Sequence, residues 1–217
     1  MGNTVALQTD STGEGSPKRR QVLDAAEKLF LAYGYGAVSM DAVARTAEVS
    51  KATLYAHFAS KDQLFATIVG ERGVVAHVED VLPAGPVDDL RAALQTIGER
   101  VLGFMLGGRT LAIFRIAIAE SARFPELGEA FHAAGPQKFC DRVRLWLSVQ
   151  QEAGLVRPVD LEVATQQFMA LMRSSLFLRA SLGLPPAPGE QDIHATVAAA
   201  VETWMCAFGT NPSEIAE

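Results

Sequence analysis

The segment VSMDAVARTAEVSKATLYAHFASKDQLF, from Val38 to Phe65, decides the fold of this chain. Ser39 and Ser50 stand at positions where a serine side chain can cap the N-terminus of a helix. The four residues 47–50 between the two helices have the length of a tight turn. The segment therefore predicts two short helices joined by a turn, which is a helix-turn-helix.

The second helix of this motif, residues 51–58, is predicted to face outward on its polar side. Leu54 and Phe58 lie one helical turn apart and are expected to face inward. An α-helix fits the major groove of B-DNA, and in this motif the second helix enters the groove with its N-terminal residues at the base edges. We therefore expect contacts with double-stranded DNA from these residues: Ser39, Ser50, Lys51, Ala52, Thr53, Tyr55, His57 and Lys61.

The side chains at these positions suit such contacts. Lys51 can contact a phosphate or a guanine, and Thr53 and Tyr55 can hydrogen-bond or touch a thymine methyl group. Lys61 begins the next helix, where its charge and the free amides would clamp a phosphate. Structural alternatives stay open: Tyr55 as a packing residue, Lys61 as a solvated charge, and His57 as a local hydrogen-bond donor.

Charge is distributed unevenly along the chain. The net charge is −6, and that total by itself disfavours a nucleic-acid-binding protein. Residues 17–65, however, hold seven basic and five acidic residues, a net charge of +2, whereas residues 66–217 hold twelve basic and eighteen acidic residues, a net charge of −6. A basic N-terminal module on an acidic body would turn one face toward phosphate and keep the other away.

The spacing of apolar residues along the chain predicts an all-α protein of about nine helices. Residues 1–16 are rich in Gly, Ser, Thr and Asp and are expected to form a disordered tail. Residues 17–65 are expected to form a helix-turn-helix domain, with the motif itself at about 39–58. Residues 66–217 continue as further helices, and a hydrophobic content of 49% supplies enough apolar residues for a sizeable core.

Prolines, glycines and capping residues mark where the C-terminal helices should begin and end. A segment begins at Pro125, is interrupted or kinked at Gly135-Pro136 and ends near Gly154. Asp160 is expected to cap a single long helix that reaches Leu182.

The N-terminal region also carries several spaced motifs together. They are Ala25-Ala26, Phe30, Gly34-Tyr35, Val43-Ala44, Ala47-Glu48-Val49-Ser50, Leu54-Tyr55-Ala56-His57-Phe58 and Ser60-Lys61-Asp62-Gln63-Leu64-Phe65. With these motifs, Pro17–Val69 resembles the N-terminal domain of the TetR/AcrR family of bacterial transcriptional regulators. Glu48 departs from the pattern, because members often have glycine in the turn, so modest backbone strain is expected there.

The C-terminal region shows a second resemblance. Residues 114–127, FRIAIAESARFPEL, with Phe131 and Gly135-Pro136, look like the AefR/AcrR-like subgroup. The family resemblance implies a variable helical domain that dimerises and holds a small-molecule pocket. Together with the helix-turn-helix and the apolar residues described below, it leads us to expect a repressor that binds a palindromic operator as a homodimer and is released by a small, largely apolar effector. Residues 66–217 would then form the regulatory and dimerisation domain.

Aromatic and methionine residues of the middle helices suit an adaptable apolar cavity, although any helical core contains similar residues. The candidate pocket residues are Phe104, Met105, Phe114, Ile118, Phe124, Phe139, Trp146, Phe168 and Met172. Glu120, Arg115, His132 and Arg173 are candidates for polar contacts with a ligand. Each of these four could equally be a paired surface charge.

The last helices carry broad apolar faces, and two such helices from each subunit could form a four-helix dimer interface. The candidate interface residues are Phe168, Met172, Leu176, Arg179, Val201, Trp204, Met205 and Phe208. The alternative is that these faces only complete the core of the monomer.

The sequence indicates neither an enzyme nor a metal or cofactor site. The four histidines show no pairing at i,i+4, and no glycine-rich phosphate loop or nucleophile–base spacing is present. Cys140 and Cys206 could act as a redox sensor or be small buried helix residues. No apolar run reaches the roughly 18 residues of a membrane span, and the N-terminus does not resemble a secretory signal, so a cytoplasmic protein is expected.

Two other functions remain compatible with the sequence. The first is a DNA-binding regulator with no small-molecule effector, which a tightly filled C-terminal core would favour. The second is a ligand carrier or an enzyme whose N-terminal helices are vestigial, which failure to bind any DNA at low salt would favour. Lys51, Tyr55 and Lys61 on one face argue against this second alternative.

Overall fold

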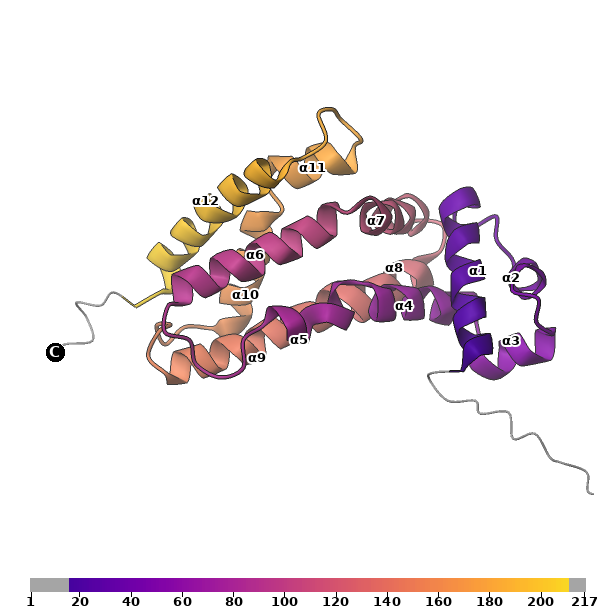
Figure 1. The fold of residues 1–217 in the computed structure, drawn as a ribbon, viewed down its shortest axis with the longest axis horizontal. Helices are drawn as coiled ribbons and strands as arrows, with labels where there is room; N and C mark the ends of the chain where they lie inside the picture. Colours follow the sequence, from indigo (N-terminus) through magenta and orange to yellow (C-terminus); the bar gives the residue numbers. More distant parts are fainter. Residues whose placement is uncertain (1–15, 211–217) are drawn as a thin grey trace, which may run out of the picture.

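The computed structural model describes residues 16–210, without the side chains of Val74, His77, Val78 and Glu79. All of the expected tail except Ser16 lies outside the described residues. Figure 1 shows an elongated all-α molecule in which α1, α2 and α3 form a group at one end of a larger helical body. Between residues 16 and 210 there is no strand, so the predicted all-α class is confirmed.

The helices follow one another along the chain with short connections. They are α1 (Pro17–Tyr33), α2 (Met40–Thr46), α3 (Lys51–His57), α4 (Lys61–Arg72), a 3₁₀ turn (Val74–His77), α5 (Val78–Val81), α6 (Leu90–Leu106), α7 (Gly108–Glu120), α8 (Pro125–His132), a π-helical turn (Ala133–Gln137), α9 (Lys138–Glu152), α10 (Leu161–Met172), α11 (Ser175–Ser181) and α12 (Glu190–Phe208).

The breaks between helices follow the prediction in one place and differ in another. The π-helical turn contains Gly135 and Pro136, so the α-helical pattern is interrupted at the residues where the sequence predicts an interruption or a kink. The long helix expected after Asp160 is wrong, because the structure divides it into α10 and α11. Arg173 has a ψ of 42° and Ser174 is extended, so the helical path ends there. Serines compete for backbone hydrogen bonds and favour helix starts, which is the local signal for this break.

The N-terminal helices pack around three aromatic rings. Phe30, Tyr35 and Phe65 are each at most 1% exposed, and their ring centroids lie 5.6–5.7 Å apart. Leu54 and Phe58 of the helix-turn-helix are buried in the same cluster, which confirms their predicted inward orientation. Aromatic pairs at this separation stabilise a core beyond the area that they bury.

The core of the N-terminal helices continues into the body rather than ending at residue 65. Ile113 and Ala117 of α7 and Leu127 of α8 belong to the same buried cluster. The Glu120 carboxylate, at the end of α7, accepts a hydrogen bond of 2.8 Å from the backbone N–H of Gly36. Helix α7 is therefore attached to the loop that follows α1.

A second core lies between α6, α9, α10 and α12. It buries four of the residues predicted for a dimer interface, namely Phe168, Met172, Val201 and Trp204, each at most 1% exposed. The interface prediction is wrong for these four, because side chains without exposed surface in one subunit cannot touch a second one. The alternative from the sequence, completion of the monomer core, holds for them.

Helix length and hydropathy give a limited result on membrane insertion. Among residues 16–210, no single helix is both long and apolar enough to cross a membrane. The pair α6 and α7, bent by 67°, passes the same test together by length and composition alone.

Glu48 is the one non-glycine residue with a positive φ, 53°, in the part of the chain that the structure describes. The strain expected in this turn is therefore present. We expect Glu48→Gly to raise the free energy of unfolding by about 0.5–1 kcal/mol, because relief of left-handed strain exceeds the added chain entropy of glycine. Urea unfolding checks this, with Glu48→Ala as the control that keeps the strain. A loss of stability in the glycine variant would show that Glu48 makes a compensating contact.

Candidate functional site

The exposed face of α3 is the first candidate site. Lys51, Ala52 and Tyr55 are exposed, the last with 49% of its surface accessible, while Thr53 and His57 are half-buried. These residues are held outward because Leu54 is fully buried on the opposite side of the helix. The result is a short helix that presents a lysine, a small residue and a tyrosine together on one surface.

The serines that precede the two helices of the motif act as caps. The Ser39 hydroxyl accepts from the Ala42 amide at 3.1 Å, and the Ser50 hydroxyl accepts from the Thr53 amide at 3.0 Å. Ser50 also shares a 2.8 Å hydrogen bond with the Thr53 hydroxyl. Such caps satisfy amides that the helix itself leaves free. Both serines therefore fix the geometry of the motif, and their contact with DNA stays a prediction.

Lys51 links the two helices of the motif. Its ammonium group lies 2.6 Å from the carboxylate of Asp41, at the start of α2, and both side chains are more than half exposed. An exposed pair of this kind contributes little to stability, roughly 0–1 kcal/mol. Lys51 can therefore exchange Asp41 for a phosphate at small cost.

The Lys61 ammonium is turned inward in this structure. It donates hydrogen bonds to the carbonyl oxygens of Tyr35 (2.8 Å) and Val38 (2.9 Å) and lies 4.0 Å from the centre of the Tyr35 ring. Burial lowers its pKa, an effect that Glu120 and Glu126 partly offset. Lys61 thus ties the loop before α2 to α4. This structural role was not predicted, and a phosphate contact by Lys61 stays a prediction.

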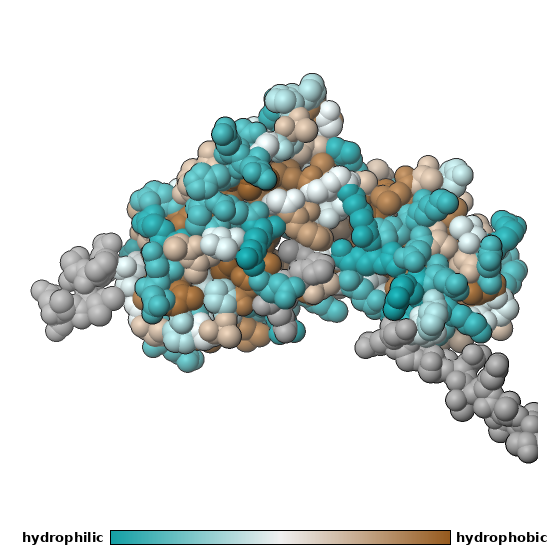
Figure 2. Space-filling view, in the orientation of Figure 1, coloured by the Kyte–Doolittle hydropathy of each residue, from teal (hydrophilic) through white to brown (hydrophobic). Residues whose placement is uncertain are grey.

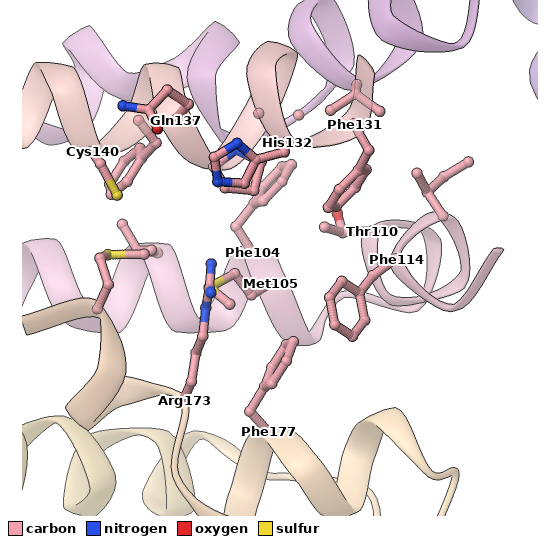
Figure 3. A pocket seen from close by; sticks show the side chains of 18 of the residues that line it. Phe104, Met105, Thr110, Phe114, Phe131, His132, Gln137, Cys140, Arg173 and Phe177 are labelled. Carbon is pink, nitrogen blue, oxygen red and sulfur yellow. The ribbon is translucent and has the colours of Figure 1, made fainter. Parts of the chain in front are cut away.

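The second candidate site is a cavity of about 770 Å³ in the body. Helices α1, α4, α6, α7, α8, α9, α10 and α11 and the π-helical turn line it, and Figure 3 shows aromatic side chains directed into it from several of them. Five predicted pocket residues are in its wall: Phe104, Met105, Phe114, Ile118 and Phe139. The volume falls in the range of about 300–1,000 Å³ typical of ligand pockets.

The pocket prediction is wrong for four residues. Trp146, Phe168 and Met172 are at most 6% exposed and belong to the core between α6, α9, α10 and α12. Phe124 packs instead on the N-terminal helices, with its ring 5.3 Å from that of Tyr35. Helical periodicity identifies apolar side chains but does not distinguish those around an empty space from those in close contact.

Of the four polar residues considered as ligand contacts, two lie at the cavity and two do not. His132 and Arg173 line the cavity. Arg115 donates instead to the carbonyl oxygens of Ser181 and Ala180, where it caps the C-terminus of α11. Glu120 is held by the loop after α1 and is not part of the wall.

A charged cluster at one side of the cavity joins three helices, and the sequence did not single it out. Glu27 of α1 is only 7% exposed, yet its carboxylate accepts from Arg72 of α4 at 2.5 Å and from the guanidinium of Arg109 of α7. Arg72 also pairs with Asp24. Glu27, Arg72 and Arg109 all line the cavity. The N-terminal helix therefore forms part of the cavity wall.

Cysteine and metal chemistry find little support in this geometry. Burial raises the pKa of the Cys140 thiol, against the opposing charge of Arg173, so the reactive thiolate is disfavoured. Cys206 lies on the exposed side of α12. Across the described residues, no group of three or more His, Cys, Asp or Glu side chains is arranged to hold a metal ion.

Comparison with known families decides what this arrangement is. Residues 22–68 match the family described as bacterial regulatory proteins, tetR family. Residues 92–210, more than half of the chain, match the family described as AefR-like transcriptional repressor, C-terminal domain. The chain belongs to the TetR family. It is a TetR-family DNA-binding transcriptional regulator, and both resemblances identified in the sequence are confirmed.

Individual TetR-family relatives agree with this assignment. The flavonoid-responsive regulator FrrA is 34% identical with a TM-score of 0.72, and the match covers 89% of this chain and 98% of that one. A TetR regulator from Agrobacterium tumefaciens is 28% identical with a TM-score of 0.74, covering 92% and 98%. The uncharacterized HTH-type transcriptional regulator YhgD from Bacillus subtilis (strain 168) is 43% identical over 51 residues, 24% of this chain and 27% of that protein. This chain spans only 19–32% of the length of the curated relatives that it matches.

Proposed function

We propose that this protein is a cytoplasmic repressor that binds a palindromic operator as a homodimer and is released by a small, largely apolar effector. Residues 17–65 would form the DNA-binding domain, and residues 66–217 the regulatory and dimerisation domain. The observation that carries the proposal is the α3 surface, where buried Leu54 and Phe58 hold Lys51 and Tyr55 outward. A helix presented in this way fits the major groove.

The proposed dimer follows from the way in which a helix-turn-helix reads DNA. Two such modules contact half-sites about 34–36 Å apart, or a multiple of that distance, and a two-fold protein matches a palindrome. For the interface we propose the part of α11 and α12 that remains accessible. Leu178 and Leu182 are 59% and 65% exposed, and Leu176, Met205 and Phe208 are half-buried. Arg179, also exposed, would lie at its edge.

The proposed release mechanism uses the shared wall between the cavity and α1. Helix α7 lines the cavity and holds the N-terminal helices at two points, Glu27 through Arg109 and Gly36 through Glu120. Helix α4 also lines the cavity and holds Glu27 through Arg72. A ligand that binds better when α4 and α7 are displaced would shift α1 and change the spacing of the two α3 helices. The shift is limited by the difference in ligand affinity between the two states.

The cavity supports an effector over the two alternative functions. A regulator without an effector would be expected to have a filled core, whereas this body contains about 770 Å³ of space lined largely by apolar side chains. FrrA, described as flavonoid-responsive, supports a small aromatic molecule as the effector. A carrier with vestigial DNA-binding helices would have no need for the intact caps at Ser39 and Ser50.

We expect Tyr55→Ala to weaken binding to a selected operator by about tenfold or more, because a good base contact is worth about 1–3 kcal/mol. Binding is measured by fluorescence anisotropy at fixed salt, with Tyr55→Phe separating the hydroxyl from the ring. Tyr33→Ala is the matched control, since Tyr33 is also an exposed tyrosine but lies at the end of α1. Equal affinity of the Tyr55→Ala variant and the native protein would show that Tyr55 does not contact DNA. A lower melting temperature of the variant would show that Tyr55 stabilises the fold.

A further inference from the structure

Among the described residues of the cavity wall, Arg173 is the one arginine that is not paired with a carboxylate. Among the described residues, Arg72 and Arg109 are both paired with Glu27. The Arg173 backbone N–H donates to the Met169 carbonyl. Its guanidinium, which lines the same cavity, has no hydrogen bond or ion pair with another side chain in the described part of the chain. Figure 3 shows its side chain extending into the cavity from the lower wall toward His132, which projects from the opposite wall.

Arg173 stands where the chain changes direction between two helices of the cavity wall. It is the last residue before the break between α10 and α11, and its ψ of 42° ends the α-helical path at that point. The ψ of a residue sets the path of the chain that follows it, so the break redirects α11 while α10 places Arg173. Arg173, before the break, and Phe177, after it, both line the cavity.

The carboxylates of the cavity wall do not compensate this charge. Glu27 is held by Arg72 and Arg109. Glu162 accepts from the Gln166 amide at 2.7 Å and lies 3.5 Å from Arg144, which is outside the wall. Both acidic groups are thus engaged, and Arg173 and the His132 imidazole are left to face the space.

We propose that the effector is an amphipathic organic anion, an aromatic or alicyclic body that carries a carboxylate, sulfonate or phenolate. The anionic group binds Arg173 and His132, and the apolar body lies among Phe104, Phe114 and Phe177. This inference rests on the proposed function of the cavity and names the chemical class of its ligand.

Energetics favour an anion over a neutral or cationic ligand. A ligand that fills the cavity removes water from Arg173, and a guanidinium that loses water without gaining a partner is costly. A charge-assisted hydrogen bond offsets this loss and is about twice as strong as a neutral one. The guanidinium of Arg173 would repel a cationic ligand. The aromatic rings of the wall provide affinity for the body of the ligand. Because ring faces attract cations, the preference for an anion comes from Arg173 and not from the rings.

The test uses two fluorescent probes with the same anilinonaphthalene skeleton. 8-Anilinonaphthalene-1-sulfonate carries an anionic group, and N-phenyl-1-naphthylamine does not. Each is titrated into the full-length protein and into Arg173→Gln, Arg173→Lys and Lys138→Gln. Lys138 is exposed at the start of α9 and does not line the cavity, so it controls for general surface charge. Thr110→Trp, which fills space at the wall, defines the fraction of each signal that comes from the cavity.

We expect the cavity to bind the sulfonate more tightly than the neutral probe. Arg173→Gln should weaken sulfonate binding by about tenfold or more and change neutral-probe binding by less than twofold. Arg173→Lys should retain part of the affinity, and Lys138→Gln all of it. If Arg173→Gln weakens the binding of both probes equally, or leaves the sulfonate affinity unchanged, the proposal that the effector is an anion is wrong. If Thr110→Trp changes the signal of neither probe, the cavity does not bind these ligands. The proposed function of the cavity, and with it the release mechanism, would then be wrong.

Discussion

Replacing Trp204 by alanine is expected to lower the free energy of unfolding by about 3–5 kcal/mol, the range for large aromatic residues removed from a core. Trp204 has no exposed surface, and its ring packs at centroid distances of 6.2 Å from Phe168 and 5.3 Å from Phe208. Its indole N–H donates to the Ala164 carbonyl at 2.8 Å. The substitution therefore leaves both a cavity and a buried acceptor without its partner.

Urea unfolding at several protein concentrations measures this effect, because the stability of a dimer depends on concentration. Thr203→Ala, at the exposed neighbouring position of α12, is the matched control and should change stability by less than 0.5 kcal/mol, roughly the limit for surface sites. Dissociation of a dimer by Trp204→Ala, without loss of stability in the subunit, would instead place Trp204 at a subunit interface.

Glu27→Gln is expected to cost about 3 kcal/mol of stability and to uncouple the cavity from the DNA-binding helices. Its carboxylate is nearly buried and pairs with two arginines, so its loss leaves Arg72 with only Asp24 and Arg109 without a carboxylate. Removing one partner of a buried pair typically costs about 3–5 kcal/mol. The lower end applies because the Arg109 side chain is half exposed.

The matched control for Glu27 is Glu71→Gln. Glu71 also pairs with an arginine, Arg19, but its side chain is 44% exposed, so the expected loss is at most about 1 kcal/mol. Both variants are compared by urea unfolding and by operator binding with and without a ligand of the cavity. We expect only Glu27→Gln to reduce the effect of the ligand on operator affinity. Equal behaviour of the two variants would show that Glu27 does not connect the cavity to α1.

The helix-turn-helix could be predicted because its determinants are local. Ser39 and Ser50 cap the two helices, and the spacing of Leu54 and Phe58 sets the inward face, as the structure confirms. Such signals act within one or two helical turns. The strain at Glu48, by contrast, is predicted from the family resemblance, because members often have glycine at this position, and its φ of 53° agrees with that prediction.

The cavity and its connections could not be predicted because they depend on contacts between distant segments. Glu27 and Arg109 are in contact although they are 82 residues apart in the sequence, and Gly36 and Glu120 are 84 residues apart. Periodicity identifies Trp146 and Phe104 as apolar without telling which lies in the closed core and which faces the cavity. The break at Arg173 was also missed, because consecutive serines are only a weak signal against a long apolar pattern.

Selection of bound fragments from a randomised DNA pool tests the function of the α3 surface most directly. The full-length protein is used at a defined salt concentration, with Tyr55→Ala in parallel, because phosphate contacts make affinity depend on salt. We expect enrichment of one palindrome whose half-sites lie about 34–36 Å apart, or a multiple of that distance, and loss of this enrichment in the variant. Binding that is sensitive to salt but shows no preferred sequence would contradict a site-specific repressor.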